Sequence, residues 1–87
     1  MNNFIPNSNP NLWAIRHASD GSLILAPIIY WIDIKLQRIP VDLTRFAIDW
    51  RHLLDADFAV YDDNSGCVFL RNGDIFGTLD AFKAASQ

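Results

Sequence analysis

The 87-residue chain has few of the residues that mark specialised sites. Its one cysteine, Cys67, cannot close a disulfide within the chain, which excludes a disulfide-stapled scaffold. Seven Lys and Arg against ten acidic residues give a net charge of −3, which opposes the capture of phosphate backbones. We therefore expect no nucleic-acid partner.

Glutamate is absent, so all ten acidic residues are Asp. Because the short Asp side chain competes for nearby backbone N–H groups, it favours caps and turns over helix interiors. The acids are spread from Asp20 to Asp80 and do not gather in one segment, which disfavours a mimic of nucleic acid. We expect many of them to mark the ends of elements.

Long apolar runs are also missing. The longest, residues 23–32, is interrupted by Pro27 and is too short to cross a bilayer. The amino terminus shows no basic region followed by an apolar stretch, so no signal peptide is recognised. These absences predict no membrane partner and a cytoplasmic location.

No motif for catalysis, metal binding or phosphate binding is present. Cys67 has no local nucleophile signature with His17 or His52, and these three residues lack the close spacing of zinc ligands. The segment 62–66 resembles a calcium loop but lacks a third oxygen ligand before Gly66 and a closing Glu. We expect no cofactor and favour a non-catalytic role, although enzymatic activity stays open.

What the chain does have is apolar and aromatic residues, with 51% hydrophobic residues, three Trp and six Phe. A folded chain of this mass exposes about 5,000 Å² and buries about 64% of its unfolded surface, enough for one small domain. Residues 1–11 hold five Asn and two Pro and predict a flexible tail. Residues 12–87 are expected to form a single α+β domain.

The first half of that domain shows strand patterns. Residues 12–18 alternate, residues 19–22 supply a turn, and residues 23–26 read as the returning strand. Residues 28–36 are ambiguous. Their alternation and β-branched content favour a strand, and a helix opening at Pro27 is the alternative.

The clearest helical pattern covers residues 42–55. Asp42 is the expected N-cap, with Val41 and Phe46 placed to form a hydrophobic staple. Five apolar residues recur at helical spacing and define the core face. They are Leu43, Phe46, Ala47, Trp50 and Leu54.

The last third predicts a meander of strands over 58–62, 67–71 and about 74–76, closed by a short helix over 79–86. Asn72-Gly73 indicates a two-residue type I′ turn, which sets Phe69 opposite Phe76. Thr78 is expected to cap the closing helix, which packs through Leu79 and Phe82. A rival helix starting at Asp74 would place Gly77 in its interior.

Together these elements predict an α+β fold: an antiparallel sheet of five or six strands, made of two hairpins and a meander, packed against one amphipathic helix plus a short C-terminal helix. The expected register sends apolar residues to both faces of the sheet, and the helix covers only one. The second face is covered by the chain itself or meets another molecule.

We therefore predict a non-catalytic protein-interaction module that self-associates as a homodimer or binds a protein partner. Aromatic residues and Arg are enriched in such contacts. One alternative is a small-ligand binder or enzyme with a pocket between helix and sheet, using His17, His52 or Asp49. Another is a small inhibitor of the kind carried by phage or mobile elements. The predicted protein-binding residues are Tyr30, Trp31, Phe69, Arg71 and Phe76.

Overall fold

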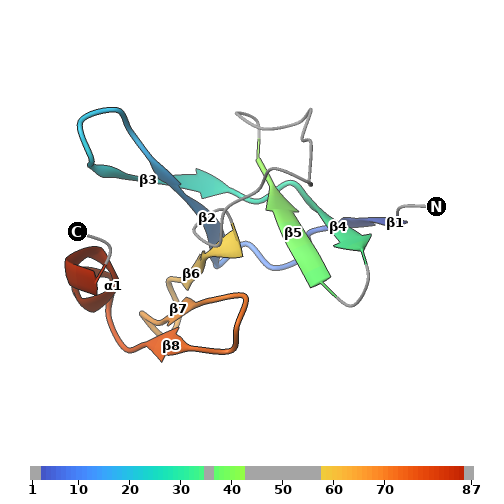
Figure 1. Ribbon diagram of the computed structural model, residues 1–87. Coiled ribbons are helices and arrows are strands. Elements are labelled where there is room, and N and C mark those ends of the chain that lie inside the picture. Colours follow the sequence, from blue (N-terminus) through green and yellow to red (C-terminus); the bar gives the residue numbers. More distant parts are fainter. Residues whose placement is uncertain (1–2, 35–36, 43–57, 86–87) are drawn as a thin grey trace.

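The computed structural model describes residues 3–34, 37–42 and 58–85. These residues form two antiparallel sheets, of three and five strands, and one short helix (Figure 1). The α+β class is confirmed, but the prediction of a single sheet was wrong. Except for Asp42, the predicted helix over 42–55 lies outside the described residues.

The smaller sheet has the strand order β1-β4-β5, formed by β1 (Asn3–Pro6), β4 (Tyr30–Ile34) and β5 (Gln37–Val41). The strand prediction for the ambiguous segment 28–36 is therefore confirmed over Tyr30–Ile34. Strand β4 is the central strand of this sheet, and its apolar residues pack on both faces: Tyr30 and Ile32 in the cluster with Phe58, and Trp31 against the cluster with Ile28.

Strand β1 corrects the prediction of a flexible tail over residues 1–11. Phe4 lies opposite Ile32 and Ile5 opposite Trp31 across the β1–β4 ladder. The Phe4 ring also meets the Tyr30 ring edge-on, with centroids 5.6 Å apart. Proline and asparagine disfavour strand interiors, but Pro6 is tolerated here because β1 is an edge strand.

The larger sheet has the order β3-β2-β6-β7-β8. The predicted hairpin at its start is confirmed, with Ser22 donating to Asp20 within the turn. Strand β2 then pairs with the meander of the last three strands. The five strands are β2 (Leu12–His17), β3 (Leu23–Pro27), β6 (Val60–Asp62), β7 (Val68–Phe69) and β8 (Ile75–Phe76).

The β7–β8 hairpin forms with a register one residue away from the predicted one. The Leu70 N–H donates to the Asp74 carbonyl at 2.9 Å, which leaves a three-residue loop closed by Gly73 at φ +94°. A turn followed by a left-handed glycine is the usual form of such a loop. Phe69 therefore lies opposite Ile75, not opposite Phe76. Since side chains alternate between faces, the shift turns Phe76 to the opposite face from that predicted.

Helix α1 (Leu79–Ala85) begins at the predicted residue and has the predicted cap, because the Ala81 N–H donates to Thr78 Oγ1 at 3.0 Å. Its Phe82 is buried in a cluster with Ile15 and Val68, and Leu79 packs against the same cluster. The helix therefore covers one face of the larger sheet, as predicted for its two packing residues.

The opposite face of the larger sheet is covered in its middle by the chain itself. Ala14 and Val60 are cross-strand partners on that face, and both are buried in a cluster with Ile28, against which Trp31 packs. A further cluster containing Phe58 forms on the smaller sheet. The two sheets thus meet over β2 and β6, and the ends of the larger sheet project beyond the contact (Figure 1).

Candidate protein-interaction surface

One row of side chains crosses the larger sheet on the face opposite α1. Val60 lies opposite Phe69, and Phe69 lies opposite Ile75. The exposed fraction rises along this row, from 8% for Val60 to 38% for Phe69 and 61% for Ile75. Val60 packs in the cluster with Ile28, whereas the last two apolar side chains of the row are partly exposed. We call Phe69 and Ile75 the hairpin patch.

Polar groups border the hairpin patch at the loop that joins its strands. The Asn72 side chain accepts from the Asp74 N–H at 2.9 Å and donates to the Asp74 carboxylate at 3.1 Å. The Arg71 guanidinium lies 4.6 Å from the centre of the Phe58 ring, in cation–π range. An ordered polar loop therefore borders the two exposed apolar side chains.

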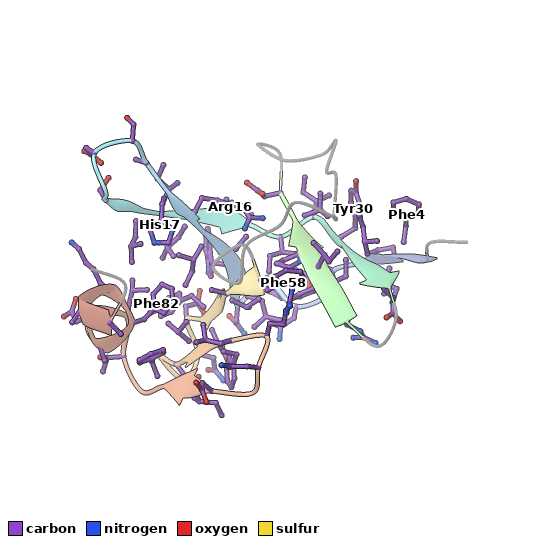
Figure 2. All side chains as sticks on the ribbon, viewed as in Figure 1. Phe4, Arg16, His17, Tyr30, Phe58 and Phe82 are labelled. Atoms are coloured by element: carbon purple, nitrogen blue, oxygen red, sulfur yellow. The ribbon has the colours of Figure 1, made fainter. Side chains whose placement is uncertain are left out.

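The structure does not bring the five predicted binding residues into one surface. Phe69 and Arg71 lie on the same hairpin, but Phe76 is half-buried and meets the Phe82 ring edge-on at 5.7 Å. Tyr30 and Trp31 lie on the smaller sheet. Figure 2 shows Tyr30 beside Phe4, at the opposite end of the molecule from Phe82.

Tyr30 and Trp31 are both half-buried and make contacts within the chain. Tyr30 packs against the cluster that contains Phe58. The Trp31 Nε1–H donates to Asn7 Oδ1 at 3.2 Å, while the Asn7 amide nitrogen donates to the Ile28 carbonyl at 3.0 Å. The Tyr30-Trp31 segment thus covers part of the second face of the larger sheet, which the sequence left either to the chain itself or to another molecule.

Ile75 belongs to the hairpin patch but was not among the predicted binding residues. The two-residue turn expected at Asn72-Gly73 would have placed Ile75 on the face with Val68, which is covered. No sequence signal separates that turn from a three-residue loop ending in the same glycine, because both need Gly73 in the left-handed region.

A second exposed apolar side chain lies at the other end of the same sheet face. Ile24 of β3 is 48% exposed and lies opposite Arg16 of β2. Arg16 itself is buried. The uncovered parts of this face are therefore its two ends, at β3 and at β7–β8.

Two of the residues weighed for catalysis, His17 and Cys67, lie in the described part of the chain. His17 is exposed and its ring lies 6.5 Å from that of Phe82, while Cys67 is half-buried with its Sγ 4.0 Å from the Ser65 carbonyl. His52 and Asp49 lie outside the described residues. Within the described ranges, no three His, Cys, Asp or Glu side chains gather as metal ligands would.

The segment that resembles a calcium loop forms a turn. Asp62 Oδ1 accepts from the Asn64 N–H at 2.9 Å, and the Asp62 carbonyl accepts from the Gly66 N–H at 2.8 Å. Gly66 has φ +80°. These hydrogen bonds close the turn that joins β6 to β7.

A shallow groove of about 340 Å³ is lined by the end of β1, the segment that follows it, and residues of β4 and β5. Its lining includes Asn7, Trp31 and Arg38. His17 does not line this groove. The pocket predicted between the 42–55 helix and the sheet involves His52 and Asp49, which lie outside the described residues.

The sequence matches no protein-family model, and no curated protein or solved structure is found to be similar. Over the described part of the chain, no helix is long and apolar enough to span a membrane. Since no similar protein is found, a function is inferred from the residues of the hairpin patch and of its surroundings.

Proposed function

We propose that the chain is a non-catalytic protein-interaction module that self-associates, with the hairpin patch as a contact and Arg71 at its border. The observation that carries the proposal is the exposure of two cross-strand apolar partners, Phe69 at 38% and Ile75 at 61%. Both stand on a sheet face whose middle is covered by the chain's own smaller sheet.

Burial of this patch supplies the driving force. Removing apolar surface from water contributes roughly 25 cal/mol per Å², and aromatic residues and Arg are enriched in protein contacts. A two-fold axis would place the patch of one copy on the same patch of another, the arrangement of the commonest soluble assemblies. A cytoplasmic location is part of the proposal, because a single unpaired cysteine suits a reducing compartment.

Sedimentation velocity at several concentrations tests the proposal. The unmodified chain is expected to sediment as a dimer or larger species, and Phe69→Ser with Ile75→Ser is expected to lower the average mass. Phe4→Ser is the matched control, because Phe4 is 62% exposed but lies on the smaller sheet. Circular dichroism checks that each variant stays folded.

Two results would overturn this proposal. One is a chain that stays monomeric at every concentration. The other is a Phe69→Ser, Ile75→Ser variant that stays folded and keeps the mass of the unmodified protein.

The groove beside Trp31 favours a second candidate, a small-ligand binder. Arg38 can pair with a carboxylate and Trp31 can stack on an aromatic ring, so together they suit an aromatic carboxylate. Titration with benzoate, followed by NMR chemical shifts of the Trp31 indole N–H, tests this candidate. Arg38→Gln should remove the shifts, and their absence in the unmodified chain would rule out this ligand class.

A further inference from the structure

The free edge of β3 differs from the other strand edges of the described sheets. In β5 the Pro40 residue has no N–H, and its carbonyl accepts from Arg16 at 3.0 Å. Strands β1 and β8 are shorter than β3, with four and two residues against five. Strand β3 has the sequence Leu-Ile-Leu-Ala-Pro, without a charge and with its only proline at the last position. Such an uncharged edge is open to pairing with another strand.

The hydrogen bonds of the β2–β3 hairpin show which backbone groups face that edge. The Ala18 N–H donates to the Ser22 carbonyl at 2.9 Å, so this pair is a hydrogen-bonded one. Because such pairs alternate along an antiparallel ladder, Ile24 bonds to β2, whereas Leu23 and Leu25 direct their N–H and C=O groups away from it.

A second bond confirms this alternation. Ile15 lies opposite Leu25, and the Ile15 N–H donates to the Ala59 carbonyl at 3.3 Å, on the side of β2 away from β3. The backbone of Ile15 therefore does not bond to Leu25. Among the strands that the structure describes, β3 is the last of its sheet, so the N–H and C=O groups of Leu23 and Leu25 face outward from the sheet edge.

We propose that this edge pairs antiparallel with β3 of a second copy, about a two-fold axis at Ile24. This inference rests on the self-association in the proposed function and adds a contact distinct from the hairpin patch. The segment Leu23-Ile24-Leu25 reads the same in both directions. The axis therefore sets Leu23 opposite Leu25 of the second copy and Ile24 opposite Ile24. The outward N–H and C=O groups then form four hydrogen bonds across the seam.

The side chains fit the same arrangement. Ile24, now 48% exposed, would meet its equivalent in a non-hydrogen-bonded pair, where the Cα atoms approach to about 4.5 Å. Leu23 and Leu25 pack against the cluster under α1, and the seam would continue this cluster into the second copy. Strand β3 has no charged residue, so none of the charges that give each copy its net charge of −3 would lie on the paired strands.

The joined strands would form one sheet of ten, with the hairpin patches at its two far edges. Pairing would stop at Pro27, which lacks an N–H, and at the turn around Asp20. The edge contact and the hairpin patch are thus separate surfaces, and variants of one leave the other intact.

Disulfide trapping tests the predicted register. In a Cys67→Ser background, Ile24→Cys is expected to form a disulfide-linked dimer on mild oxidation, because the two thiols would meet on the axis. Ile29→Cys is the matched control, since Ile29 is 42% exposed but lies outside β3. Equal trapping at both positions, or none at position 24, would overturn the proposal.

A charged side chain at the proposed two-fold axis tests how much the β3 contact contributes to the stability of the dimer. We combine Ile24→Lys or the control Ile29→Lys with Phe69→Ser and Ile75→Ser, and measure mass by sedimentation and fold by circular dichroism. Without the hairpin patch the chain is expected to remain dimeric through β3. Ile24→Lys should then raise the dissociation constant at least tenfold, since two like charges would face each other, whereas Ile29→Lys should not.

The outcomes separate this inference from the proposed function. A folded patch variant that is monomeric overturns the β3 seam and leaves the hairpin patch as the self-contact. An equal effect of Ile24→Lys and Ile29→Lys also overturns the seam. A monomeric unmodified chain overturns both proposals.

Discussion

At the residue scale, the ion pair of Arg16 and Asp42 joins the two sheets. Arg16 lies on β2 (Figure 2). Asp42 follows β5, and the exposed fractions of the two side chains are 8% and 0%. Arg16 Nε and Nη2 donate to Asp42 Oδ1 at 3.1 and 3.0 Å, and Nη2 also donates to the Pro40 carbonyl. The sequence analysis assigned Asp42 only a cap, because a pair 26 residues apart leaves no local pattern.

Removing one partner of this pair should destabilise the protein strongly. We expect Asp42→Asn to lower the free energy of unfolding by about 3–5 kcal/mol, because the buried Arg16 would keep its charge and lose the Asp42 carboxylate. The double variant Arg16→Met, Asp42→Leu should recover most of that loss, since both charges of the pair are removed together. Urea unfolding followed by circular dichroism measures both. A double variant less stable than Asp42→Asn would contradict this account.

Also at the residue scale, Asp20 makes the stability of the folded state depend on pH. The side-chain hydrogen bond from Ser22, followed by the Ser22 backbone N–H, lowers the pKa of Asp20 below its ordinary value of 3.8. A lowered folded-state pKa contributes stability that is present above pH 3.8 and is lost as the pH falls through the folded value. We expect Ser22→Ala to raise the pKa of Asp20, measured by NMR titration of its carboxyl carbon. An unchanged pKa would show that the hydroxyl hydrogen bond is not formed in solution.

At the element scale, the turn residues determine the loop conformation of the β7–β8 hairpin. Gly73 has φ +94°, so Gly73→Ala is expected to cost about 1–2 kcal/mol from backbone strain alone, with no atom within 4 Å of the added methyl group. Gly77→Ala is the matched control, because its added methyl group also meets nothing within 4 Å and its φ is not in the left-handed region. Urea unfolding compares the two variants. Equal losses would show that strain at Gly73 is not the cause.

The same elements show how far the sequence determines structure. Alternation identified β2, β3 and β6, and the pattern around Thr78 identified α1 and its cap, because these signals depend on neighbouring residues. The register of β7–β8 could not be predicted, since Asn72-Gly73 fits loops of two or three residues. Strand β1 was missed because it forms against β4, some 25 residues later in the chain.

At the scale of the whole molecule, the sequence predicted the class but not the division into two sheets. Strand pairing between distant segments carries no local signal, and β4 pairs with β1 and β5 and not with the larger sheet. The candidate surface was predicted in part. Phe69 lies exposed as the sequence suggested, whereas Phe76 and Ile75 exchanged faces with the one-residue shift.

The division into two sheets leads to a prediction about cooperativity. Ile28, Ala14 and Val60 form one buried cluster that connects the sheets, so neither sheet is expected to unfold alone. Hydrogen exchange should give the same opening free energy for the most protected amides of β2 and β4. Ile28→Ala should lower both values equally, by about 2–5 kcal/mol, because it removes packing on both sides of the contact.

The adjacent residue supplies the control for this prediction. Ile29 is 42% exposed, so Ile29→Ala should cost less than about 1 kcal/mol in the same exchange experiment. If Ile28→Ala lowered the opening free energy of β4 while leaving that of β2 unchanged, the sheets would be separate folding units. The larger sheet, which carries the hairpin patch, would then fold without the smaller sheet that covers its middle. The contact between the two sheets would no longer explain why that face is only partly exposed.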